Sequence, residues 1–162
     1  MFLRVSLSRQ LLDLLDEHGG VQRSFAISSS ARGAGELVNS QKTPRGLHRI
    51  RAKIGTGVPV GGVFVGRRYT GEIYTPKLAA RFPERDWILS RILWLCGCEP
   101  GRNRFGNVDS ARRYIYIHGT PDSEPMGVAR SHGCIRMRNS ELLWLYEPVA
   151  VGSRADSAQL LG

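Results

Sequence analysis

Short runs in which hydrophobic and polar residues alternate, separated by glycine and proline, dominate this chain. Alternation of this kind places apolar side chains on one face of an extended strand. The turn residues His18-Gly19-Gly20 indicate an early hairpin. The pattern favours a mainly β fold of short strands joined by turns. It predicts strands over residues 2–8, 21–28, 46–54, 62–66 and 87–95.

A later alternating run ends at His118. Its isoleucines, Ile115 and Ile117, are expected to face a core, while Tyr114, Tyr116 and His118 share the opposite face. The glycine and threonine that follow are expected to end the strand. The imidazole is then expected to emerge beside two aromatic side chains that line a cleft.

One helix is predicted after the last cysteine. Asn139 or Ser140 can cap its N-terminus, and Pro148 ends it after Tyr146. The leucines between them are expected to pack on a sheet. Beyond the helix, residues 153–162 are polar and then weakly helical in pattern.

Length and composition indicate one domain. The 162 residues suffice for one hydrophobic core, so we expect a single domain over residues 1–162. No apolar run is long enough to cross a bilayer. Residues 28–35, rich in serine and glycine, are expected to form a mobile loop. Residues 1–8 lack the features of a secretory signal, which predicts a cytoplasmic protein as written, or a periplasmic or cell-envelope protein if a leader was trimmed.

The charge favours anionic partners without naming one. The net charge is +9, with twenty arginines against three lysines. We do not expect nucleic acid to be the partner, because the sequence has no recognisable nucleic-acid motif and no Lys/Arg run longer than a pair. Scattered solvated arginines are the plainer explanation.

The segment Ser131-His132-Gly133-Cys134-Ile135-Arg136 carries the strongest chemical signal. A cysteine attacks as thiolate, and with an ordinary pKa of about 8.5 it needs a nearby base or cation at neutral pH. His118 is our first choice of base. The N–H groups of Gly133 and Cys134 can point at a developing oxyanion. Arg136 can lower the pKa of the thiol or, like Arg138, hold a substrate carboxylate.

Other interpretations of the same residues exist. A lone cysteine or histidine is usually a buried structural residue. His118, His132 and Cys134 can also form a three-ligand zinc site, although the usual companion motifs of catalytic zinc are missing. Cys96-Gly97-Cys98 is too tight for an easy disulfide, and three cysteines suggest no disulfide framework, which favours a reducing compartment.

The stretch from His118 to Asn139 resembles the active-site segment of the L,D-transpeptidase catalytic domain, the YkuD family, in which a histidine precedes Ser/Thr-His-Gly-Cys by a dozen or more residues. The resemblance implies Cys134 as nucleophile, His118 as proton acceptor and donor, and Gly119 as the residue whose carbonyl orients that imidazole. Earlier, Thr43-Pro44-Arg45-Gly46 resembles the family's Thr-Pro-x-Gly segment at the start of a strand.

The resemblance also assigns the neighbours of the thiol. Ser131 and Gly133 match the turn around it, and Arg136 matches a position that the family fills with Arg or Asn. With Tyr116, these residues are the candidates for substrate binding. We expect His132 to be secondary, and the second nitrogen of His118 to face Cys134 within hydrogen-bond reach.

For the fold, the resemblance implies a mainly β, L,D-transpeptidase-type β-sandwich of mixed sheets with one or two short helices. It makes residues 11–17 a strand, although their doubled leucines also fit a helix. It further implies a closing strand after Gly152, from which the polar pattern of residues 153–162 departs.

For the activity, the resemblance implies a cysteine acyltransferase that needs no cofactor or metal. Its partners are peptidoglycan stem peptides or muropeptides, and carbapenems are expected as covalent inhibitors. The bond between the L-centre of a diamino acid and D-Ala is cleaved through a thioester. An amine acceptor makes the protein an L,D-transpeptidase, and water makes it an L,D-carboxypeptidase of peptidoglycan recycling. A non-catalytic wall-peptide binding module is the less favoured reading.

Overall fold

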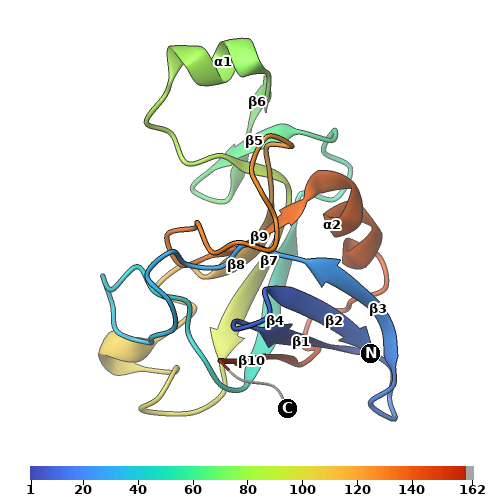
Figure 1. Ribbon diagram of the computed structural model, residues 1–162, viewed down its shortest axis with the longest axis vertical. Helices are drawn as coiled ribbons and strands as arrows, with labels where there is room; N and C mark the ends of the chain where they lie inside the picture. Colours follow the sequence, from blue (N-terminus) through green and yellow to red (C-terminus); the bar gives the residue numbers. More distant parts are fainter. Residues whose placement is uncertain (160–162) are drawn as a thin grey trace.

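A computed structural model describes residues 1–159, whose strands form two sheets (Figure 1). The first sheet has the strand order β10-β1-β2-β3. Strands β1, β2 and β3 pair antiparallel, and β10 pairs parallel to β1. The bounds are β1 (Phe2–Ser6), β2 (Leu11–Leu15), β3 (Val21–Ala26) and β10 (Ala155–Ala158).

The second sheet has the order β6-β5-β7-β8-β9, and β4 pairs with β7 beside β5. All neighbours in it are antiparallel except β8 and β9. Its strands are β4 (His48–Ile54), β5 (Gly62–Val65), β6 (Arg68–Ile73), β7 (Ile88–Gly97), β8 (Tyr116–Thr120) and β9 (Ile135–Arg138). The helices are α1 (Pro76–Arg81), α2 (Asn139–Tyr146) and a short 3-10 turn, η1 (Gly106–Val108).

One hydrophobic core lies between the two sheets. Leu12 and Phe25 of the first sheet, Leu93 and Ile117 of the second, and Leu142 of α2 belong to a single buried cluster. The sheets therefore pack face to face, and the expected mainly β sandwich of mixed sheets with two short helices is confirmed. None of the helices within residues 1–159 has the length and hydrophobicity that a bilayer crossing requires.

The strands expected from alternation are present with slightly different ends, and residues 11–17 contain strand β2, not a helix. The β2–β3 hairpin also agrees with the prediction. Alternation does not predict β6 or α1. Helix α1 nevertheless has sequence signals, because the hydroxyl of Thr75 accepts the N–H of Leu78 at 3.0 Å and Pro76 occupies the first turn.

Strands β5 and β6 and helix α1 form a projection, drawn furthest from the first sheet at the top of Figure 1. Strand β5 ties this projection to the sandwich by pairing with the first residues of β7. The turn between β5 and β6 reaches the candidate site described below.

The expected end of the strand at His118 is wrong. Gly119 and Thr120 remain in β8 because they pair in parallel with Met137 and Arg138 of β9. A glycine ends a strand only when its backbone no longer pairs with a neighbouring strand. Gly119 still pairs with β7 on one side and with β9 on the other.

The predicted start of this strand is also too early. Tyr114 has a left-handed backbone (φ 57°) and belongs to a turn. Ile115 and Ile117 do face the core. Tyr116 and His118, however, are buried as well, at 5 % and 1 % exposure, so the expected open cleft beside them is wrong. The projection formed by β5 and β6 covers this face.

The capping prediction for α2 is wrong. Arg138 occupies the N-cap position without a side-chain cap bond, and Asn139 is already the first helical residue. Leu142 and Leu145 pack in the core as expected, and the helix ends at Tyr146 before the proline at 148.

The expectation for the C-terminal segment needs correction. Residues 155–158 form β10 at the edge of the first sheet, where Ala155 and Ser157 point inward and are buried. Small side chains fit this edge without an apolar pattern, which is why alternation does not reveal the strand. Residues 160–162, part of the segment expected to be weakly helical, lie outside the described residues.

Candidate active site

Cys134 lies directly before β9, and its side chain shares a face of the second sheet with His118. The parallel register pairs His118 with Arg136, so Cys134 lies level with Tyr116, two residues before His118 along the neighbouring strand. Because side chains two residues apart point to the same side, Tyr116, His118, Cys134 and Arg136 share one face.

Backbone groups of the segment leading into β8 hold the sulfur. Sγ of Cys134 lies 3.3 Å from the carbonyl oxygen of Tyr114, to which the thiol donates. It also accepts the N–H of Tyr116 at 3.4 Å. The left-handed conformation of Tyr114 is costly for a residue other than glycine, and it turns this carbonyl toward the thiol.

The surroundings keep the thiol protonated. The Cys134 side chain reaches the surface in part, yet its sulfur packs against a hydrophobic cluster. Desolvation raises the pKa of Cys134 to about 12, and the carboxylate of Asp86 adds to the increase. The N–H of Tyr116 and the charges of Arg136 and Arg113 act in the opposite direction but do not compensate. The neutral thiol is therefore the resting form at pH 7.

His118 is buried and held by one hydrogen bond. Its Nδ1 lies 2.6 Å from the carbonyl oxygen of Gly119. A carbonyl only accepts, so we assign the proton to Nδ1 and the lone pair to Nε2. Burial lowers the pKa of His118 below its usual value near 6.5, while Asp86 and the Gly119 carbonyl oppose the decrease. The imidazole is therefore neutral at pH 7.

The expected hydrogen bond between His118 and Cys134 is not formed. Within residues 1–159, the sulfur makes its hydrogen bonds with the backbone of Tyr114 and Tyr116 alone. The physical reason is the register, because His118 lies two residues further along β8 than the level of the sulfur. The two groups must come closer before a proton can pass between them.

Gly119 is required by close packing. A Cβ at this position would collide with the amide oxygen of Asn139 and the carbonyl of Leu89. The same amide accepts the Ser90 hydroxyl at 2.7 Å and donates to the Thr120 carbonyl at 3.0 Å. These bonds explain why Asn139 does not cap α2. They also fix the end of β8, from which the carbonyl that holds the imidazole projects.

The turn before Cys134 is held by hydroxyl groups. Ser131 donates to the Cys134 carbonyl at 2.5 Å and accepts the N–H of Gly133 at 3.2 Å. Thr43 donates to the Gly133 carbonyl at 2.9 Å. The N–H of Gly133 is thus engaged, whereas that of Cys134 has no hydrogen-bond partner among the described residues. Of the two expected oxyanion donors, only the N–H of Cys134 is free.

The segment 28–31 braces this turn from the other side. Ser28 exchanges backbone hydrogen bonds with Arg136 at 3.0 and 2.9 Å, and the N–H of Ser131 bonds the carbonyl of Ser29 at 2.8 Å. The Ser28 hydroxyl also accepts the N–H of Arg130 at 3.1 Å. The prediction of a mobile loop over residues 28–35 is therefore wrong for its serines, because burial of their hydroxyls and backbone ties them to the site.

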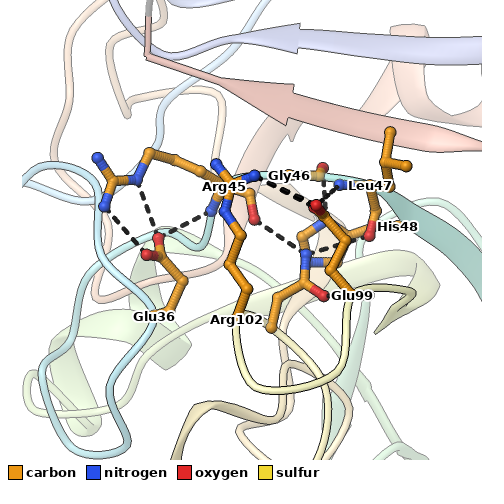
Figure 2. A network of polar contacts seen from close by, with 8 residues as sticks. Glu36, Arg45, Gly46, Leu47, His48, Glu99 and Arg102 are labelled. Carbon is orange, nitrogen blue, oxygen red and sulfur yellow. Dashed lines mark hydrogen bonds and ion pairs between the residues drawn. The ribbon is translucent and has the colours of Figure 1, made fainter.

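A polar network holds the segment that directly follows Thr43 (Figure 2). Arg45 contacts both carboxylate oxygens of Glu36 at 3.0 Å, and Glu99 accepts the N–H of Leu47 at 2.8 Å. Burial alone would raise the pKa of Glu36, but the hydrogen bonds from Arg45 outweigh it and lower the pKa. The bond from Leu47 lowers the pKa of Glu99. Both carboxylates therefore stay charged and keep residues 43–47 in place.

Arg136 is already matched by carboxylates. Its guanidinium lies 3.3 Å from Asp86 and 3.6 Å from Glu124, and its side chain is only 10 % exposed. His132 lies on the rim, 65 % exposed, with Nδ1 3.9 Å from the other Asp86 oxygen. These four residues border a cavity of about 230 Å³. The charge of Arg136 is thus already balanced by two carboxylates of this chain.

Arg67 fastens the β5–β6 turn onto this site. Its guanidinium lies 4.6 Å from the ring centre of Tyr114 and 5.0 Å from that of Trp94. It also donates to the Tyr116 hydroxyl at 2.9 Å. Burial raises the pKa of Tyr116, and Arg67 opposes this only in part, so the phenol stays neutral. Arg67 thus contacts Tyr114 and Tyr116, the two residues whose backbone groups make hydrogen bonds with the thiol.

The three candidate zinc ligands do not converge. Within residues 1–159 no group of three or more His, Cys, Asp and Glu side chains is arranged to hold a metal ion. His118 points to the Gly119 carbonyl, while His132 is turned to the rim. Cys96 and Cys98 are free thiols, as the spacing argument expected.

A second buried histidine, His48, pairs with a serine hydroxyl and has a structural role. Nε2 of His48 lies 2.8 Å from the hydroxyl of Ser110, and both residues are at most 1 % exposed. Burial lowers the pKa of His48, although the Gly46 carbonyl at Nδ1 opposes the decrease. No substrate can reach this pair, so it stabilises the fold and is not a catalytic site.

Three residues of the site escape the sequence pattern, namely Arg67, Asp86 and Asn139. Asn139 carried a signal, a polar residue at a helix start, but its amide serves β8 and not the helix. Arg67 lies in a tight turn and Asp86 on a loop, where charged residues are ordinary. Only the three-dimensional fold brings these two to the face of Cys134.

The sequence matches the family described as the L,D-transpeptidase catalytic domain (YkuD) over residues 1–156. "Probable L,D-transpeptidase YbiS" of Escherichia coli (strain K12) is 45 % identical over 42 residues, which cover 26 % of this chain and 14 % of that protein. The matched part is therefore a small share of that relative.

Solved structures with the same fold have low sequence identity. L,D-transpeptidase 3 from Mycobacterium tuberculosis, in complex with a faropenem-derived adduct, superposes with a TM-score of 0.57 at 16 % identity, covering 96 % of this chain and 59 % of that one. LD transpeptidase LdtMt1, in complex with imipenem, gives a TM-score of 0.56 at 17 % identity over 97 % of this chain and 58 % of that one.

The chain thus spans about three fifths of these solved proteins, and at such identities they establish its fold. The family match is stronger, because it includes both β8 and the cysteine turn. By this match, the chain belongs to the L,D-transpeptidase catalytic domain (YkuD) family.

Proposed function

We propose that this chain, as one catalytic domain, is a cysteine acyltransferase that acts on peptidoglycan stem tetrapeptides. It cleaves the bond between the L-centre of a diamino acid and D-Ala, and passes the acyl group to an amine. The observation that carries the proposal is the placement of Cys134 and His118 on one face of β8 and β9, with the imidazole held by Gly119. The solved relatives bound to imipenem and to a faropenem-derived adduct support an acylable thiol.

The first half-reaction starts from two neutral groups. Since the pKa of Cys134 is about 12 and that of His118 is lowered, no preformed ion pair is present. The lone pair on Nε2 accepts the thiol proton as sulfur attacks the carbonyl carbon. The N–H of Cys134 binds the developing oxyanion. His118 then gives its proton to the amine nitrogen of D-Ala, the C–N bond breaks, and a thioester remains.

The second half-reaction reverses the roles. An acceptor amine attacks the thioester, His118 takes its proton, and the sulfur leaves and regains a proton as the new amide forms. With water as acceptor, the product is a shortened peptide, which is L,D-carboxypeptidase activity. The same groups on this chain act with either acceptor, so the reaction products distinguish the two activities.

Mass spectrometry of a tetrapeptide incubation tests the proposal. A dimer joined through two diamino acids means transpeptidation, and tripeptide plus D-Ala means hydrolysis. We expect the dimer with free D-Ala. If a folded protein forms neither the dimer nor the tripeptide, the proposal is contradicted. A large excess of tripeptide over dimer at millimolar peptide would mean that the activity is L,D-carboxypeptidase and not transpeptidase.

Cysteine variants provide the matched controls. Cys134→Ala should abolish both products and the mass adduct formed with a carbapenem. The double variant Cys96→Ala/Cys98→Ala removes the other two thiols and should retain both. Near-normal turnover by Cys134→Ala would rule out the thioester.

A further inference from the structure

A groove of about 600 Å³ lies beyond Tyr114, on the same face of the second sheet as Cys134. Trp94 of β7 pairs with Tyr116 of β8, so its side chain is on the face that carries Cys134. Cys96, two residues further along β7, is on the same face, and it pairs with Arg49 of β4. The segment between β7 and β8, yellow in Figure 1, supplies the outer wall. The polar lining includes Arg49, Arg51, Arg104, Arg112, Cys96 and Cys98.

None of these four arginines forms an ion pair within residues 1–159, whereas seven other arginines of the chain do. Arg49 donates to the Gly152 carbonyl at 2.7 Å, which leaves Arg51, Arg104 and Arg112 for a ligand. All three are exposed. Arg51 stacks on Trp94 at 4.6 Å and Arg104 on Phe105 at 4.7 Å, which leaves their N–H groups free for a ligand.

The single carboxylate that lines the groove is engaged elsewhere. Asp109 accepts the N–H of Phe105 at 2.7 Å and that of Arg112 at 3.0 Å. Burial would raise the pKa of Asp109, but these backbone bonds outweigh it and lower the pKa. One negative charge therefore faces four guanidinium groups, and the groove has an excess of positive charge at neutral pH.

The rim shows local strain. Phe105 and Tyr114 have left-handed backbones (φ 68° and 57°), and the two residues are 54 % and 52 % exposed. Such conformations persist where the surrounding structure imposes them, often at ligand sites. Tyr114 lines the groove, and its carbonyl accepts the hydrogen bond from the Cys134 thiol, so the groove lies next to the thiol.

We propose that this groove binds the free carboxylates of an acidic peptide, namely the part of the wall peptide that extends away from Cys134. Planar guanidinium groups pair with carboxylates through two parallel hydrogen bonds, and aromatic rings at the rim pack against the peptide backbone and side chains. The inference rests on the proposed function for the identity of the peptide. It assigns carboxylate recognition to Arg51, Arg104 and Arg112, since Arg136 is neutralised by Asp86 and Glu124.

Binding to the Cys134→Ala protein tests the groove without turnover. The probes are the stem tetrapeptide ending in meso-diaminopimelate–D-Ala and the same peptide with its carboxylates amidated, titrated by calorimetry. We expect the acidic peptide to bind at least about tenfold tighter than the amidated one. Increasing salt should reduce this difference, because the groove is open to solvent.

Substitution then locates the site. Adding the triple change Arg51→Gln/Arg104→Gln/Arg112→Gln should weaken binding of the acidic peptide about tenfold or more and abolish the preference over the amidated peptide. The matched control removes the same charge from exposed arginines elsewhere that form no ion pair within the described residues, and it should bind within twofold of the parent. That control is Arg9→Gln/Arg32→Gln/Arg81→Gln.

The two groove thiols give a second readout. Bound acidic peptide should slow alkylation of Cys96 and Cys98 severalfold in the Cys134→Ala protein, and should not do so in the groove triple variant. Circular dichroism checks that both triple variants fold.

Three results would overturn the inference: unchanged peptide binding by the groove variant, an equal loss in the control variant, or tighter binding of a short oligonucleotide than of the peptide. The proposed function is tested separately. Carbapenem acylation of Cys134 should persist in the groove variant that keeps this cysteine, and its absence from the unsubstituted protein counts against the proposed function, not against the groove.

Discussion

The high pKa of Cys134 makes a quantitative prediction about its reactivity. At pH 8 a thiol with a pKa of about 12 is thiolate in about 10⁻⁴ of molecules, against about 0.1 for a reference thiol with a pKa of 9.0. A more basic thiolate is the better nucleophile, with a Brønsted slope of about 0.4–0.5, which recovers roughly 20-fold. The net expectation is alkylation by iodoacetamide roughly 50-fold slower than for an ordinary cysteine.

The assay uses the Cys96→Ala/Cys98→Ala protein, in which Cys134 is the single thiol, and follows its mass adduct from pH 7 to 10. The rate should rise about tenfold per pH unit without levelling, because the titration lies above this range. The shape of the profile separates a high pKa from steric hindrance, which lowers the rate equally at every pH. A rate that levels off anywhere below pH 10 would refute the reasoning.

Asp86 tests the cause of the high pKa. Its carboxylate raises the pKa of Cys134, so Asp86→Asn should lower this pKa and speed alkylation at pH 8 severalfold. Glu84→Gln removes the same charge from the same loop, and it should leave the rate within about twofold because Glu84 is not among the groups that shift the thiol. Equal acceleration by both variants would mean that net charge, not the position of Asp86, adds to the pKa increase that desolvation causes.

Three further predictions concern buried groups. Gly119→Ala should lower the melting temperature by several degrees and abolish tetrapeptide turnover, since a Cβ collides with Asn139 and a carbonyl; retained turnover contradicts the packing argument. His118→Gln should remove carbapenem acylation while His132→Gln keeps it, and the reverse pattern exchanges their roles. Burial lowers the pKa of His48 and His118, so below about pH 6.5 the unfolded chain binds protons that the folded chain does not. As the pH falls through this range, the free energy of unfolding in urea should decrease by up to about 1.4 kcal/mol per pH unit for each histidine. A smaller slope in His48→Gln would measure the contribution of His48.

The sequence predicts those parts of the fold that one side-chain pattern specifies. Alternation locates the strands whose two faces differ in environment, as in β4. It fails for β10, where Ala155 and Ser157 are small enough to be buried without being strongly apolar. It also misplaces the end of β8, because Gly119 is retained by strands that are distant in the sequence.

The candidate site is predictable where a motif carries it and not where tertiary contacts do. Cys134 and His118 follow from their spacing and residue types. The absence of a hydrogen bond between them depends on the parallel register of β8 and β9, which no local pattern encodes. Arg67 illustrates the same limit, since its contacts with both tyrosines arise only when the β5–β6 turn folds over the sheet.

The pairing of β1 with β10 has a consequence for how this chain folds. Residues 3 and 155 are neighbours in the first sheet, so the strand that completes its edge is synthesised last. Contacts between such distant residues carry a large loop-closure entropy and form late. During synthesis, β1 therefore presents an unpaired edge and the buried side of Leu3 to solvent until residue 158 leaves the ribosome. The first sheet is thus completed only after β10 has been synthesised, and this interval is when the edge of β1 is most exposed to edge-to-edge aggregation.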